Sequence, residues 1–265
     1  VADVSARREG NAPVAAPELL FEAIETLLDN PPADRELLAE MLTLPSEAML
    51  GEQFDAVDIF AIDAARRELK EAIATRFAKR FQALADTHAA SSAYIFDVAE
   101  AGRRRVFAVA LDYLATIEAP GLAARAAAVY DRADNMTDRM AALDALRDLN
   151  VPERQRVLDD FAQTWADYPL VMDKWLRLQA TMRRDDSVER VRELLADARF
   201  DFTNPNRIRA LLGGFVRGNR VGFHRADGAG YALIADEILR LDSLNPQLAA
   251  ALAGMLTNWA RHVPV

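Results

Sequence analysis

Apolar residues recur at helical spacing along most of this chain, and Pro, Gly, Asn and Asp separate the segments. Such spacing is typical of amphipathic helices with one buried face. No stretch shows the alternation of apolar and polar residues that predicts a strand. The pattern predicts helices over 17–28, 34–43, 63–87, 97–117, 120–134, 135–146, 152–167 and 172–178, and further ones around 188–195 and from Asn204, Tyr231 and Pro246 onward.

Short connections make consecutive helices antiparallel neighbours, so roughly a dozen helices form a string of hairpins. The predicted fold is all-α, a curved stack like HEAT or armadillo repeats, without a strict sequence repeat. Residues 1–16 are polar and without a pattern, and we expect a linker or arm there. Residues 17–265 form one helical domain, Ser91-Ser92 interrupts it, and Trp165, Trp175 and Trp259 are predicted to be core.

Composition narrows the classes of function. The chain has 265 residues, of which 51% are hydrophobic, and its net charge is −9. An acidic chain without a basic block is a poor binder of nucleic acids or anionic membranes, so neither is an expected partner. Cysteine is absent, which excludes disulfides and thiolate ligands. We find no signal peptide or membrane span, and we expect a cytoplasmic location.

The stretch from Asn204 to Tyr231 organises the rest of the chain. Its sequence is NPNRIRALLGGFVRGNRVGFHRADGAGY. Asn204 or Asn206 can cap a helix in which Pro205 occupies the first turn. A Gly-rich connection with His224 and Asp227 follows, and a hydrogen bond between these two side chains would pin the loop, although a loop His–Asp pair can also be catalytic.

Few residues carry the pattern of a catalytic site. The three histidines, His88, His224 and His262, lie far apart, and none belongs to an H-E-x-x-H zinc motif. No Gly-x-Ser-x-Gly elbow or phosphate loop is present. Residues 185–189, with the sequence DDSVE, match a spacing that holds magnesium in all-α lyases, but acidic residues at that place favour capping of a helix by Asp186 or Ser187.

Several segments resemble one family in order and spacing. They are NPNRIRALLG at 204–213, FHRADGAGY at 223–231, LNPQLAA at 244–250, and, earlier in the chain, TLPSE at 43–47, NMTD at 135–138 and LVMDKW at 170–175. Together they resemble the C-terminal domain of bacterial aminopeptidase N, a zinc-dependent peptidase of the gluzincin superfamily. The resemblance implies a helical bowl that caps a catalytic domain of the same polypeptide, encloses the active-site chamber and controls the access of peptide substrates.

By the same resemblance, this chain is non-catalytic and holds no cofactor, and zinc belongs to a catalytic domain upstream. A few more helices normally follow in the family, so the terminal cap is expected to be missing, with Leu256 and Trp259 exposed. The alternative is a free-standing HEAT-like scaffold that binds proteins or peptides. A magnesium-dependent all-α lyase is a third hypothesis, which would need a second acidic cluster facing Asp185.

The resemblance also indicates two substrate-binding residues, Arg209 and Gln247. In the family, the arginine at the position of Arg209 lies at the mouth of the cavity, where its planar fork can meet peptide groups beyond the scissile bond. Gln247 has a family counterpart that lines the same cavity. One helical turn later the family usually has an arginine, but this chain has Ala251. We expect Arg207 to be structural.

Overall fold

The computed structural model describes residues 1–90 and 93–263, and this part of the chain is helical. The only β feature within it is an isolated parallel bridge between Val57 and His262. The all-α prediction is therefore confirmed, whereas the predicted break at Ser91-Ser92 falls outside the described residues. The chain forms two compact units, one of residues 1–50 and 61–157 and the other of residues 51–60 and 158–265.

Most of the first ten helices belong to the first unit, and the division of the chain falls within α10. Their bounds are α1 Ala2–Arg8, α2 Glu18–Asp29, α3 Arg35–Leu42, α4 Glu47–Gly51, α5 Ile59–Arg76, α6 Ala78–Thr87, α7 Val98–Thr116, α8 Leu122–Arg132, α9 Met136–Leu146 and α10 Pro152–Thr164.

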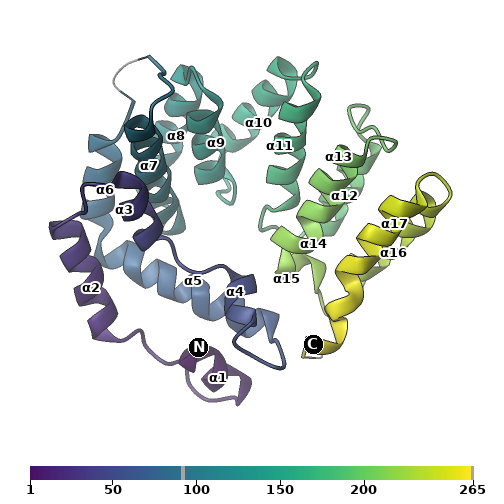
Figure 1. Ribbon diagram of the computed structural model, residues 1–265, viewed down its shortest axis with the longest axis horizontal. Helices are drawn as coiled ribbons and strands as arrows, with labels where there is room; N and C mark the ends of the chain where they lie inside the picture. Colours follow the sequence, from purple (N-terminus) through teal and green to yellow (C-terminus); the bar gives the residue numbers. More distant parts are fainter. Residues whose placement is uncertain (91–92, 264–265) are drawn as a thin grey trace. The chain divides into compact units, whose positions relative to one another are not determined.

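Helix α7 is the centre of the first unit, and α3, α6 and α9 pack against it (Figure 1). Asp97 caps its first turn by accepting hydrogen bonds from the backbone N–H groups of Ala99 and Glu100, as the sequence predicts. Phe81 of α6 stacks on Tyr113 of α7 with ring centroids 4.2 Å apart. The Tyr113 hydroxyl donates to the Leu42 carbonyl of α3 at 2.7 Å, so the only polar atom of this buried ring is satisfied.

Two predictions for the first unit need correction. The long helix predicted over 63–87 is two helices, because the backbone leaves the helical conformation at Phe77. The buried ring of Phe77 lies 6.5 Å from that of Phe21, so tertiary packing overrides a helical propensity that no Gly or Pro interrupts. The predicted arm at residues 1–16 contains helix α1, whose Val4 is buried.

The second unit contains the remaining helices. Their bounds are α11 Pro169–Ala180, α12 Ser187–Ala196, α13 Pro205–Ile208, the π-helix η1 Arg209–Gly213, α14 Gly214–Gly218, α15 Arg220–Phe223, α16 Ala229–Asp242, α17 Pro246–Ala253 and the 3-10 helix η2 Gly254–Arg261. Short segments such as α4, α13 and α15 raise the number of helices above the predicted dozen.

In the second unit, α11 packs against η1 and α14, and α16 packs against α17 (Figure 1). Gly230 permits the start of α16 to approach α15, since a Cβ at this position would lie 2.2 Å from the Phe223 carbonyl oxygen. Trp175 is core, as predicted, and its indole N–H donates to the Leu158 carbonyl. Trp259 is 68% exposed, which contradicts the prediction of a core position and agrees with the exposure that the family resemblance implies for it.

Candidate functional site

A pocket of about 250 Å³ lies within the second unit. Three parts of the chain line it: α11, the continuous helix 205–218 formed by α13, η1 and α14, and the segment where α17 passes into η2. The lining residues are Arg177, Ile208, Arg209, Gly213, Arg217, Leu248, Ala251, Leu252 and Met255.

The local sequence explains how the helix 205–218 presents its face to the pocket. The Asn204 side chain accepts a hydrogen bond from the Asn206 N–H, and Pro205 occupies the first position, so the predicted cap is confirmed. The π-helix η1 then replaces the α-helical hydrogen bonding between Arg209 and Gly213. Gly213 lines the pocket, and a Cβ there would lie 3.6 Å from the Met255 methyl group.

The pocket is positively charged, because the ionisable residues among its described lining are Arg177, Arg209 and Arg217. All three side chains are exposed. Within the part of the chain that the structure describes, no salt bridge to any of them is found, and the polar contact of Arg209 is a long hydrogen bond of 3.5 Å to the Asn206 side chain. Three neighbouring cations without carboxylate partners favour the binding of an anion.

Arg207, two residues before Arg209, has a different environment. Its guanidinium is buried, lies 2.6 Å from an Asp173 carboxylate oxygen and donates to the Pro169 carbonyl at 2.8 Å. The prediction that Arg207 is structural is confirmed. The contact also joins two of the segments that resemble the aminopeptidase family, namely LVMDKW and NPNRIRALLG.

The structure brings Arg209 and Ala251 to the same pocket. Gln247 is exposed in the first turn of α17, one helical turn before Ala251, and it does not line the pocket. Sequence reasoning missed Arg177 and Arg217. The spacing of Arg209, Gly213 and Arg217 could have indicated Arg217, because residues four apart lie on one side of a helix. No local signal indicated Arg177, which reaches the pocket from α11.

The predicted hydrogen bond between His224 and Asp227 does not occur. His224 Nδ1 lies 2.7 Å from the Tyr231 hydroxyl, and the Asp227 carboxylate accepts from the Ala229 N–H and pairs with Arg225. His224 directly follows α15 and Asp227 precedes α16, and each side chain is engaged by the partner named above. Both residues still fasten the connection, through other partners.

The acidic segment 185–189 also departs from its prediction. Asp186 stands at the start of α12, but it makes no capping hydrogen bond there. Its carboxylate instead accepts two hydrogen bonds of 2.6 Å from Arg184, which lowers the pKa of Asp186. In residues 1–90 and 93–263, no group of three or more His, Cys, Asp or Glu side chains is placed to hold a metal ion.

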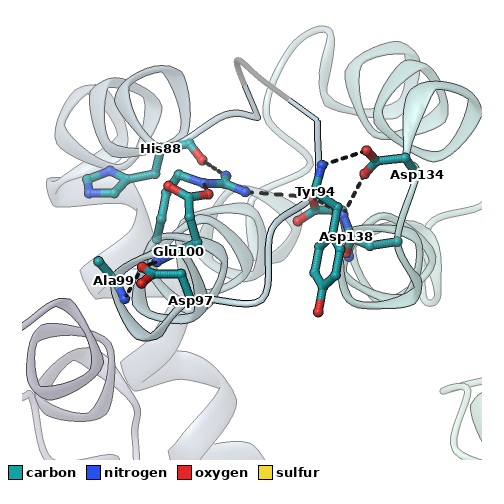
Figure 2. Close-up of polar contacts among 9 residues, drawn as sticks. His88, Tyr94, Asp97, Ala99, Glu100, Asp134 and Asp138 are labelled. Atoms are coloured by element: carbon teal, nitrogen blue, oxygen red, sulfur yellow. Dashed lines mark hydrogen bonds and ion pairs between the residues drawn. The ribbon is translucent and has the colours of Figure 1, made fainter.

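A polar cluster in the first unit includes another of the segments that resemble the aminopeptidase family, NMTD at 135–138 (Figure 2). Arg103 of α7 donates to Glu100 at 2.7 Å and to the His88 carbonyl, and it lies 3.7 Å from Asp138. Asn135 caps α9 by accepting from the Asp138 N–H at 2.9 Å. This cluster, which we call the Arg103 cluster, links α6, α7 and α9 and is structural.

Residues 2–265 match the sequence family described as a domain of unknown function (DUF3458_C) with ARM repeats. The chain belongs to this ARM-repeat family. ARM repeats are helical, which agrees with the predicted armadillo-like fold.

Relatives of this ARM-repeat chain include aminopeptidases. Aminopeptidase N of Escherichia coli is 34% identical over 257 residues, which cover 97% of this chain and 29% of that protein. Aminopeptidase N of Caulobacter vibrioides is 34% identical over 99% of this chain and 30% of its own length. This ARM-repeat chain thus spans about 30% of these relatives. The resemblance to bacterial aminopeptidase N is confirmed.

A solved structure agrees with the sequence relatives. The crystal structure of Legionella pneumophila aminopeptidase A in complex with aspartic acid has a TM-score of 0.87 and 31% identity. The match covers 98% of this ARM-repeat chain and 31% of that chain. The chain is therefore homologous to a domain of peptidases. Within its described residues, no helix is long and apolar enough to cross a membrane.

Proposed function

We propose that this chain is the non-catalytic C-terminal domain of a zinc-dependent aminopeptidase N, which removes N-terminal residues from peptides. The domain caps the catalytic domain, encloses the active-site chamber and controls which peptides enter. The observation that carries this proposal is the alignment of 97% of the chain with 29% of a named aminopeptidase N. The partners are then a catalytic domain of the same polypeptide and peptide substrates.

The proposal assigns the zinc ion to that catalytic domain. A peptidase zinc site needs two imidazoles on one helical face with a glutamate base, as in H-E-x-x-H. The histidines of this chain are at positions 88, 224 and 262, and none has that spacing. The domain contributes to catalysis by positioning the peptide and limiting water around it.

Arg209 and Gln247 are the proposed contacts to peptide residues beyond the scissile bond. Arg209 supports this role because its exposed guanidinium borders a pocket and has no acidic partner among the described residues. Gln247 is exposed at the start of α17, where its amide can donate and accept. Its position one turn before the pocket residue Ala251 places both on one side of the helix.

The experiment compares short and long substrates in the polypeptide that carries this domain. Arg209→Ala is expected to raise KM for tri- and tetrapeptides about 10- to 100-fold, since one charged hydrogen bond contributes roughly 1.5–3 kcal/mol. KM for an alanine anilide, which has no residues beyond the scissile bond, should stay nearly constant. Lys174→Ala on α11 removes an exposed charge outside the pocket and serves as the control. Equal effects of Arg209→Ala on both substrates would make Arg209 structural.

The alternative hypothesis of a free-standing scaffold predicts a different result. A scaffold would show no aminopeptidase activity in any polypeptide that carries it, and added zinc would not change this. If the complete polypeptide hydrolyses alanine anilide and the 265-residue chain does not, the scaffold hypothesis fails. If neither hydrolyses it, the proposed function fails.

A further inference from the structure

The pocket in the second unit has two chemically different sides. One side carries the guanidinium groups of Arg177, Arg209 and Arg217. The other side is apolar and comes from α17 and η2, with Leu248, Leu252 and Met255. A ligand that satisfies both sides must join an anionic group directly to an apolar group.

The π-helix η1 explains why two of the arginines act on the same space. In an α-helix, positions eight residues apart differ by roughly 80° around the axis. Arg209 begins η1 and Arg217 follows its end, and the wider turn that i→i+5 hydrogen bonding gives to η1 reduces this difference. The bulge therefore aligns their side chains, at a kind of irregularity that often marks functional sites.

The third arginine approaches from another helix. Arg177 lies on α11, which packs against η1 and α14 and so brings its side chain to the pocket. Neighbouring cations without carboxylate partners repel one another, and an anion bound between them offsets this electrostatic repulsion. Arg207, the structural arginine of the helix 205–218, is by contrast neutralised by a salt bridge to Asp173.

The size of the pocket limits the ligand. A volume of about 250 Å³ is smaller than the range of about 300–1,000 Å³ for pockets that hold drug-sized ligands. It suits one amino-acid residue better than a whole peptide. Ala251 leaves the space between the two sides open, because its side chain is a single methyl group.

We propose that this pocket binds the C-terminal residue of a short peptide, with its carboxylate on Arg177, Arg209 and Arg217 and its apolar side chain against Leu248, Leu252 and Met255. This inference rests on the proposed function, since it identifies the end of the peptide that the domain holds. The planar fork of arginine matches a carboxylate with two parallel hydrogen bonds. An inorganic anion would satisfy only the arginine side of the pocket.

The binding experiment uses the 265-residue chain and the blocked peptide acetyl-Ala-Ala-Leu, as the free acid and as the C-terminal amide, by isothermal titration calorimetry. We expect the amide to bind about 10-fold or more weakly, since it lacks a charged hydrogen-bond acceptor. Arg177→Gln and Arg217→Gln should each weaken binding of the acid about 10-fold and leave binding of the amide unchanged. Replacing the last Leu by Gly should weaken binding about 10-fold as well.

Lys174→Gln is the matched control, because Lys174 is exposed one turn before Arg177 and does not line the pocket. It should change the affinity less than 2-fold, roughly the effect of one distant screened charge. Equal binding of acid and amide, no binding of either, or an equal loss in Lys174→Gln would each overturn the proposal. Sulfate that binds as tightly as the peptide would also overturn it, as an adventitious ion only. The binding measurement needs no hydrolysis, so inactivity of the complete polypeptide towards alanine anilide would refute the proposed function without affecting this measurement.

Discussion

The Arg103 cluster and the pocket both gather charged side chains around a helix, but they use arginine in opposite ways. In the first unit, Arg103 meets two carboxylates and a carbonyl, and its side chain is only 11% exposed. In the second unit, Arg177, Arg209 and Arg217 are exposed and border apolar residues. No salt bridge to them is found within residues 1–90 and 93–263.

The difference indicates which arginines hold the fold and which are available to a ligand. A buried charge needs partners, because desolvation costs several kcal/mol, so Arg103 is part of a closed network. Exposed arginines can stay unpaired at little cost. The same difference occurs within one helix. Arg207 is buried and paired with Asp173, whereas Arg209, two residues later, lines the pocket.

The largest expected effect comes from breaking the Arg103 cluster. Arg103→Ala should lower the free energy of unfolding by about 3–5 kcal/mol, because it leaves Asp138, with a side chain 5% exposed, without its cation. Urea unfolding followed by circular dichroism measures this loss. The control is Arg105→Ala on the same helix, whose pair with Glu40 is exposed at 49% and 72%. The Arg105→Ala substitution should lower the free energy of unfolding by less than about 1 kcal/mol. Similar losses in the two variants would contradict the assignment of Arg103 as structural.

An intermediate effect concerns His224 of the second unit, which is buried and has no acidic partner in residues 1–90 and 93–263. Burial first, and then the charges of His262 and Arg220, lower the pKa of His224 from 6.5 to about 3. The folded protein therefore binds fewer protons than the unfolded chain below pH 6.5. The stability from this group is complete above pH 6.5 and falls as the pH drops towards 3.

At pH 5, the free energy of unfolding should be lower by about 2 kcal/mol than at pH 7 on account of His224, since each unit of pKa shift corresponds to about 1.4 kcal/mol. The measurement is urea unfolding at pH 7, 6, 5 and 4. His224→Gln keeps a hydrogen-bonding partner for Tyr231 but removes the titration, so its stability should fall less steeply. A slope equal to that of the unchanged protein would show that His224 is not the group responsible.

Sequence reasoning succeeds where the physical cause is local. Asn204 caps its helix as predicted, and Asp97 and Asn135 cap theirs in the same way, because a cap involves residues two or three positions apart. The sequence also distinguishes Arg207, expected to be structural, from Arg209, expected to bind substrate, although this distinction rests on the family resemblance. Sequence reasoning fails where distant segments compete. The predicted helix breaks at Phe77, whose ring packs on Phe21 of α2. A local competitor can also mislead the prediction, since Asp186 pairs with Arg184, two positions away, and makes no hydrogen bond to the backbone of α12.

The candidate site is only partly predictable for the same reason. Arg209 belongs to a recognisable segment, but a pocket is a property of several helices. Arg177 lies 32 positions earlier in the sequence and reaches the pocket only because α11 packs against η1 and α14. The spacing of four between Arg209, Gly213 and Arg217 could have indicated Arg217, but the π-helix η1 has no simple sequence signature. The sequence analysis therefore indicates Arg209 alone, whereas the folded chain places Arg177 and Arg217 at the same pocket.

The smallest expected effect tests whether the pocket arginines matter to the fold at all. Arg209→Ala should leave the free energy of unfolding unchanged or raise it by up to about 0.5 kcal/mol, because it removes one of three like charges and introduces a better helix former. Thermal or urea unfolding of the 265-residue chain measures this change. The same substitution is expected to weaken the binding of longer peptides. The free energy of unfolding and the affinity for peptides would then change in opposite directions, as they do where a residue is retained for binding. A loss above about 1 kcal/mol would place Arg209 with Arg103 and Arg207, among the arginines that hold the fold.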